Sequence, residues 1–250
     1  AICKSVTREK KMVSPPKLFD LTGLQREANR IFGYTAKQTL DLAQSLYEKR
    51  LLTYPRTDSN YLTDDMGGTA AQISGLLCKK LPFMQVSDHH AIIPTQELAK
   101  TDLAVLPESE RNILILAGAR LLFAAAEPHI YETVTAVFSC SDTDFTAKGK
   151  TVLCAGWKDL ERRYRLTLKT KSDHEDSDNL SNVPDFTEGQ TFSNISATVT
   201  AHDTQPPKPL TEASLLAAME HAGSEDTTED AERKGLGTPA TRAAVIEKLV

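Results

Sequence analysis

The sequence predicts an α+β protein in which helices come first, strands follow and helices return. Between residues 21 and 32 apolar side chains recur at helical spacing, as Leu21, Leu24 and Ala28 illustrate. From residue 131 the apolar period changes to two, which is typical of strands. Thr211 and Thr238 then precede two further apolar runs and have the chemistry of helix N-caps. These three observations carry the fold-class prediction.

The first helical region is expected to contain three segments that end before residue 80. Gly33 should terminate the first helix, and Thr35 should cap a second helix that runs to about residue 50. Thr63, followed by two aspartates, predicts a third helix through about residue 77. A longer apolar helix should begin at Pro107 and end at Pro128.

Residues 131–202 are expected to form an antiparallel sheet, with strands over residues 131–140, 145–157 and 191–201. The stretch TQPPKPL (204–210) is typical of an extended linker. After it, Thr211 should cap one helix and Thr238 another, with Pro239 at the first helical position.

The composition is that of an ordinary globular protein: 250 residues, 40% hydrophobic and 25% charged. No apolar run is long enough for a membrane helix, and the first residues lack a secretory signal, so a cytoplasmic protein without a membrane partner is expected. The four cysteines lie far apart, which favours reduced thiols over a zinc site. The first and last residues look cut, so the chain is expected to be a piece of a longer protein.

The charge is unevenly distributed, although the net charge is −5. Residues 1–60 contain eleven Lys and Arg against six Asp and Glu, whereas residues 212–232 contain seven acids and no base. A basic first quarter is compatible with an anionic partner such as a nucleic acid. A solvated surface with a chance asymmetry explains the same numbers.

The segment LLTYPRTDSNYL (51–62) places Tyr54 between a threonine and a proline. The proline favours an extended backbone at Tyr54, and Arg56, two residues on, would share its face. A tyrosine can act as a covalent nucleophile, but its pKa of about 10 requires a cationic neighbour to favour the phenolate. Arg56 could supply that charge or bind a phosphate. The alternative is a half-buried loop tyrosine beside a surface arginine.

Two other segments contain groups that could contact phosphate. His89 and His90 precede an apolar plug, AIIP, and either imidazole could donate a hydrogen bond or transfer a proton. The segment KGLGTPATR (234–242) exposes backbone N–H groups at a helix start, although ordinary capping explains the same residues. No P-loop spacing is present, so ATP is not expected.

Taken together, these motifs resemble the type IA DNA topoisomerases, most closely the bacterial topoisomerase III branch. The resemblance is carried by residues 18–62, by DHHAIIPT (88–95), by PPKPLTEASLLAAMEHAG (206–223) and by GLGTPATRAAVIEKL (235–249). It implies a multidomain protein. Its expected parts are the start of a β arch domain (1–19), a helical, winged-helix-like domain with the tyrosine (20–130), the antiparallel β arch (131–205) and part of a helical fourth domain (206–250).

The resemblance also implies an isomerase that cleaves and religates single-stranded DNA through a 5′-phosphotyrosine, without ATP. Tyr54 would be the nucleophile, Arg56 would stabilise the phosphate and His89 would touch it, while His90 is assigned no role. The predicted contacts to the DNA backbone are Thr238, Thr241 and Arg242. Mg²⁺ would be held by an N-terminal TOPRIM domain that we do not find in this sequence, so no metal or cofactor site is expected here and the piece alone should be inactive.

By inference from the family, the protein should act as a monomer that lets one strand pass through the broken one. A non-catalytic winged-helix DNA-binding module is the main alternative, because it also explains the helices and the basic first quarter. A tyrosine recombinase would need an H-x-x-R motif, which HHAIIP lacks.

Overall fold

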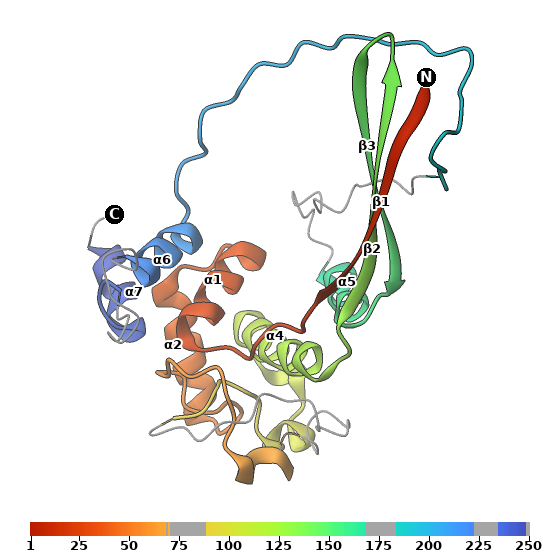
Figure 1. Cartoon of the computed structure of the whole chain (residues 1–250). Coiled ribbons are helices and arrows are strands. Elements are labelled where there is room, and N and C mark those ends of the chain that lie inside the picture. The colour runs from red at the N-terminus through yellow and green to blue at the C-terminus, as the bar shows by residue number, and fades with distance from the viewer. Residues whose placement is uncertain (69, 71–88, 169–183, 223–234, 249–250) are drawn as a thin grey trace, which may run out of the picture. The chain divides into compact units, whose positions relative to one another are not determined.

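The computed structural model describes residues 1–68, 70, 89–168, 184–222 and 235–248 (Figure 1). These residues form two compact units, which are described separately below. Unit 1 contains residues 1–15 and 127–208, and unit 2 contains residues 16–126 and 209–250. The chain therefore passes between the units three times, next to Pro15, Glu127 and Pro209.

Unit 2 begins with the two predicted helices, α1 (Leu21–Phe32) and α2 (Ala36–Glu48). The carboxylate of Asp20 caps α1 by accepting the Gly23 N–H at 2.6 Å, and Gly33 ends the helix with φ of 71°. Thr35 caps α2 as predicted, because its hydroxyl accepts the Gln38 N–H at 3.0 Å. The predicted helix pair and its turn are confirmed.

The long apolar helix is α4 (Glu108–Ala125), which begins after Pro107 as predicted. Its Ile113, Leu114, Ala117 and Leu121 are all buried, so it lies in the core of unit 2. In the described residues between α2 and α4 the structure contains the short 3₁₀ turns η1 (Asp64–Met66), η2 (Gln96–Lys100) and η3 (Leu103–Val105). The helix predicted for residues 63–77 starts with η1, and most of it lies outside the described residues.

Unit 2 ends with α6 (Glu212–His221) and α7 (Pro239–Glu247), and both begin where the sequence predicts. Each starts with a reciprocal capping box, Thr211 with Ser214 and Thr238 with Thr241. Leu216, Ala243 and Ile246 form a buried cluster with Ala36, which joins these helices to α2. In Figure 1 both helices lie beside α1. The helices α6 and α7 thus pack on the tyrosine-bearing part of the chain; a separate fourth domain, like the other predicted domain boundaries, stays a prediction.

Unit 1 is built on a three-stranded antiparallel sheet with the order β1-β2-β3. The strands are β1 (Ile2–Val13), β2 (His129–Cys140) and β3 (Thr143–Cys154). A tight turn with left-handed backbone at Ser141 and Asp142 joins β2 to β3, so that Cys140 pairs with Thr143. The expectation that the first residues belong with the sheet agrees with the position of β1 along the whole length of β2.

Two predictions within unit 1 were wrong. Residues 191–201 form no strand; the place beside β2 is taken by β1, and the segment makes an isolated bridge between Thr191 and Ile2. The period-two pattern is weak in β1 because charged residues fill this edge strand. A helix, α5 (Trp157–Leu168), also follows β3 where only sheet was expected. Ion pairs at i,i+4, such as Glu161 with Arg165 at 2.6 Å, support it.

Among the described residues no helix combines the length and the apolar character needed to cross a bilayer.

Candidate active site

The segment before Tyr54 is paired with the segment after the two histidines. The Thr53 N–H donates to the Ile93 carbonyl at 3.0 Å, and the Thr95 N–H donates to the Leu51 carbonyl at 3.0 Å. Leu52 and Pro94 form an antiparallel bridge between these two bonds. The two segments, residues 51–53 and 93–95, are 40 or more residues apart in sequence and are joined as a short two-stranded ribbon.

Thr53 fixes the residue immediately before the tyrosine with its side chain as well. Its hydroxyl donates to the Ala91 carbonyl at 3.1 Å and accepts the Ile93 N–H at 2.9 Å. Both partners lie in the apolar plug, whose Ala91, Ile92 and Ile93 are 0%, 1% and 0% exposed. The prediction that this plug anchors the histidine loop is confirmed, and the anchor extends to Thr53.

The segment after Tyr54 is also tied down. Thr57 is buried, and its carbonyl accepts a hydrogen bond at 3.0 Å from the N–H of Leu21, the first residue of α1. The Asn60 amide donates to the Leu18 carbonyl at 3.1 Å, and the Tyr61 carbonyl accepts the Ala91 N–H at 2.7 Å. Because hydrogen bonds hold the backbone on both sides, the loop presents Tyr54 from a fixed base.

The ring of Tyr54 lies between two other aromatic rings and outside the apolar core. Tyr47 approaches it edge to face, with ring centroids 5.5 Å apart and an angle of 74°. The His89 imidazole lies on it with centroids 4.5 Å apart and a tilt of 46°. Tyr54 is half-buried, whereas the adjacent Pro55 is buried and anchors the turn. The ring is therefore not packed into the core, and its half-buried position beside the exposed Arg56 fits both the catalytic interpretation and the alternative of an ordinary loop tyrosine.

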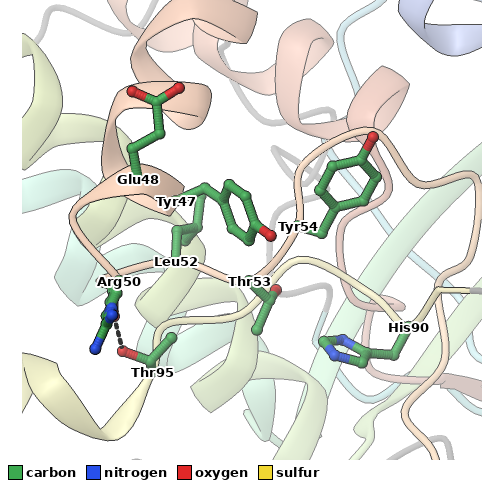
Figure 2. Close-up of a pocket in the computed structure, with 8 residues that line it drawn as sticks. All are labelled: Tyr47, Glu48, Arg50, Leu52, Thr53, Tyr54, His90 and Thr95. Atoms are coloured by element: carbon green, nitrogen blue, oxygen red, sulfur yellow. Dashed lines mark hydrogen bonds between the residues drawn. The ribbon is translucent and has the colours of Figure 1, made fainter.

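Tyr54 borders an open pocket of about 520 Å³ (Figure 2). The pocket is lined by Tyr47, Glu48, Arg50, Leu52, Thr53, Tyr54, His90 and Thr95. In Figure 2 the Tyr47 ring extends toward Tyr54, while the Tyr54 hydroxyl points away from His90. His90 binds back to the chain, with its Nδ1 2.9 Å from the Ala91 carbonyl. The combination of aromatic and polar side chains suits a nucleotide.

Arg56 is exposed and has no hydrogen-bond or ion-pair partner among the described residues. A hydrogen bond from Lys37 to Asp41 is the main cause that raises the pKa of Lys37, and the positive charge of Arg56 opposes it. Lys37 is paired with the Asp41 carboxylate, whereas Arg56 keeps its charge without a partner among the described residues. An unpartnered guanidinium is available for a phosphate.

The three residues predicted to contact the DNA backbone are occupied within unit 2. The Thr241 hydroxyl accepts the Thr238 N–H at 2.9 Å and lies 3.0 Å from the Thr238 hydroxyl. Arg242 is only 4% exposed, and it donates to the Leu236 carbonyl at 3.0 Å and the Thr22 hydroxyl at 3.1 Å. Their capping and packing roles are observed, while their contact with DNA stays a prediction.

The two glycines before this helix serve the packing of unit 2. Gly235 has φ of 57°, and a Cβ there would lie 2.5 Å from the carbonyl oxygens of Met219 and Glu220. The following Leu236 N–H donates to Met219 at 2.7 Å. The glycine-rich turn therefore lets the chain approach the end of α6 closely.

No cluster of three or more His, Cys, Asp or Glu side chains suited to a metal ion occurs in the part of the chain that the structure describes. The described residues around Tyr54 include the carboxylate of Glu48 but offer no further acid in the pocket lining. They do not form a Mg²⁺ site by themselves.

Comparison with known proteins agrees with the resemblance. The family model described as DNA topoisomerase matches residues 1–250. The chain belongs to the DNA topoisomerase family. It is 37% identical over 279 residues to DNA topoisomerase 3 of Bacillus licheniformis and 35% identical to that of Bacillus subtilis. The match covers 100% of this chain and 37% of each relative, so the chain spans well under half of their length.

A solved structure has the same fold. Full-length topoisomerase I from Thermotoga maritima matches with a TM-score of 0.75 and 24% identity, over 100% of this chain and 40% of that one. The prediction of a type IA topoisomerase of the topoisomerase III branch is confirmed at the level of the family.

Sequence reasoning missed two residues that shape this site. Tyr47 lies within the predicted second helix and was not singled out from the sequence, although it is 41% exposed and contacts Tyr54. Thr53 was noted only as the neighbour of Tyr54. The pairing of residues 51–53 with 93–95 could not be found from periodicity, since neither segment is long enough to show one.

Proposed function

We propose that the chain is the tyrosine-bearing part of a type IA DNA topoisomerase, and that Tyr54 is its nucleophile. The observation that carries the proposal is the placement of Tyr54: a half-buried phenol at the edge of an open pocket, on backbone tied down on both sides. A nucleophile held in one place before the substrate arrives loses little entropy in the attack.

In the proposed step the Tyr54 oxygen attacks a phosphorus of single-stranded DNA and forms a phosphotyrosine ester with the 5′-phosphate. The bond from phosphorus to the 3′ oxygen breaks, the phenol loses its proton, and the departing 3′ oxygen gains one. Religation is the reverse reaction, in which the 3′ hydroxyl attacks and Tyr54 leaves. One phosphate ester replaces another, so strand passage needs no ATP.

Arg56 and His89 have distinct roles in this proposal. The exposed guanidinium of Arg56 would form paired hydrogen bonds with the phosphate and stabilise the negative charge that develops on it. The His89 ring, which lies 4.5 Å from that of Tyr54, would reach the same phosphate. Thr238, Thr241 and Arg242 would lie along the DNA backbone farther from the reaction.

Mg²⁺ would supply further charge stabilisation near the phosphate, and we expect its ligands to come from residues other than those described here. The described residues bind, orient and polarise the reacting groups without it. The exposed guanidinium of Arg56, two residues after Tyr54, would attract the polyanionic strand.

At the level of the whole protein, we propose that the helical part around Tyr54 has a winged-helix-like core and that the sheet of unit 1 belongs to an arch. Opening of a gate in the broken strand would let a second strand pass, which relaxes or decatenates DNA. The protein would act as a monomer in the cytoplasm. The three chain connections next to Pro15, Glu127 and Pro209 are the positions at which such a motion would be absorbed.

The direct test is Tyr54→Phe in the full-length protein that contains these residues. The variant keeps the ring and its contacts with Tyr47 and His89, so binding of a labelled single strand should change by less than about twofold. The covalent adduct seen on a denaturing gel should disappear. An adduct of normal yield from Tyr54→Phe would overturn the proposal, and a wild-type protein that binds but never forms an adduct would favour the non-catalytic binding module.

A further inference from the structure

Tyr47 is an aromatic side chain that α2 does not use for its own packing. The helix buries Leu40, Ala43 and Leu46, which are at most 5% exposed. Tyr47 is 41% exposed in the last turn, and among the described residues its ring contact is with Tyr54. The Tyr47 ring thus packs against the proposed nucleophile, Tyr54, and not into the core of unit 2.

The end of α2 is a rigid base for Tyr47. Lys49 and Ser45 both donate to the carboxylate of Glu110 on α4, at 2.5 Å and 2.8 Å. The next residue, Arg50, adopts a left-handed backbone with φ of 61°, and the Leu51 N–H then returns to the Leu46 carbonyl at 2.9 Å. The chain reverses at this point and leads directly into the Tyr54 loop.

The contact with Tyr54 has the geometry of a specific aromatic pair. At 5.5 Å and 74°, the edge of one ring meets the face of the other, which is the arrangement that ring quadrupoles favour. His89 lies 4.5 Å from the Tyr54 ring and comes from a different segment. Rotation of the Tyr54 side chain would break both contacts, so the two rings restrict the direction of its hydroxyl.

We propose that Tyr47 is a positioning residue, which holds the Tyr54 ring in the orientation from which its oxygen attacks the phosphate. The inference rests on the proposed function, because it assigns Tyr47 a part in that reaction. Tyr47 acts through its ring and through Tyr54, and its hydroxyl is not required. In this role its ring contributes to the rate of cleavage in the bound complex and little to the affinity for the strand.

The competing role for Tyr47 is a platform on which a base of the strand stacks in the pocket. Base stacking on an aromatic ring contributes to affinity, whereas positioning contributes to the rate of the bound complex. Loss of a stacking platform would therefore raise the Kd, whereas loss of a positioning residue would lower the cleavage rate at an unchanged Kd. The experiment measures both quantities.

The experiment compares Tyr47→Leu and Tyr47→Phe with wild type in the full-length protein. Single-turnover cleavage of a labelled strand, measured at saturating protein, gives the rate of adduct formation, and fluorescence anisotropy gives the Kd. Tyr47→Leu should slow cleavage on the order of tenfold with the Kd changed less than about twofold. Tyr47→Phe should restore the rate to within about twofold of wild type, because the ring is kept.

Tyr34→Leu is the matched control, since Tyr34 is a half-buried tyrosine of the same unit whose ring stacks on Phe32 instead. It should cleave at the wild-type rate. If Tyr47→Leu is too unstable to assay, Tyr47→Trp replaces it, and a fall in its cleavage rate at constant Kd supports the proposal, while Tyr47→Phe should still cleave like wild type. An unchanged rate in Tyr47→Leu, or a loss confined to the Kd, overturns it.

The outcome is separable from a failure of the proposed function. If wild type forms the adduct and Tyr54→Phe does not, but Tyr47→Leu cleaves normally, only the positioning role is wrong. If Tyr54→Phe still forms the adduct, the proposed function itself is wrong, whatever Tyr47 does.

Discussion

The loop around Tyr54 and the turn before α7 both looked like phosphate-binding segments in the sequence, yet the structure uses their side chains in opposite ways. Around Tyr54 the backbone groups and Thr53 are bonded within the fold, while Arg56 remains exposed and without a partner among the described residues. At the start of α7, Arg242 itself is buried and bonded, and Thr238 and Thr241 close a capping box.

The difference separates stabilising residues from reacting ones. A buried arginine whose donors are satisfied contributes to the fold and is costly to move, because a charge would lose its partners. An exposed arginine on a rigid backbone contributes little to the fold and keeps its donors for a ligand. On this basis Arg56 should matter for chemistry and Arg242 for stability.

The largest expected effect is that of Arg56→Lys on cleavage. Lysine keeps the charge but loses the paired hydrogen bonds, so single-turnover cleavage should fall by about 100-fold. The free energy of unfolding, from urea denaturation, should change by less than about 0.5 kcal/mol. Unchanged cleavage would show that Arg56 takes no part in the reaction, and the proposed difference between Arg56 and Arg242 would then fail.

The Arg242→Ala variant tests the claim that Arg242 stabilises the fold. Loss of the bonds to the Leu236 carbonyl and the Thr22 hydroxyl should lower the free energy of unfolding by about 1.5–3 kcal/mol. The same denaturation experiment on Arg56→Ala is the matched control and should show almost no change. If Arg242→Ala unfolds like wild type while DNA binding falls sharply, its predicted contact with DNA is the dominant role.

A smaller effect is expected at Glu110, which is 6% exposed and holds the end of α2 through Lys49 and Ser45. Burial acts to raise the pKa of this carboxyl, but the hydrogen bonds from Lys49 and Ser45 prevail and lower it. Because the folded pKa lies below the unfolded one, the stabilisation is present above about pH 4 and is lost as the pH falls through the lowered value.

Glu110→Gln should therefore destabilise unit 2 by about 1–2 kcal/mol at neutral pH and by less in acid. Urea denaturation at a series of pH values checks this dependence. A difference between variant and wild type that stays constant down to about pH 2 would contradict the assignment of the lowered pKa to Glu110.

Much of the fold could be predicted from sequence because its signals are local. Thr35, Thr211 and Thr238 begin helices where their chemistry requires, and Gly33 ends one in the left-handed conformation that favours glycine. The charged edge strand β1 and the helix α5 were missed in the sheet region. β1 is held by its backbone pairing with β2, which local sequence does not reveal, and α5 is supported by ion pairs such as Glu161 with Arg165.

The site was predicted in its residues but not in its arrangement. The motif of Tyr54 is visible in the sequence, whereas its pairing with residues 93–95 and its ring contacts arise from tertiary structure. Burial decides the difference between Arg56 and Arg242, and nothing in the local sequence encodes it. Both arginines follow small or turn-forming residues and are charged alike.

The most direct measurement of the central claim is the identity of the amino acid that carries the DNA. The adduct between the full-length protein and a single-stranded oligonucleotide can be trapped, digested with trypsin and analysed by mass spectrometry. The account predicts that the peptide LLTYPR, residues 51–56, carries a nucleotide on Tyr54 through its 5′-phosphate. A nucleotide attached to any other residue, or through a 3′-phosphate, would contradict it.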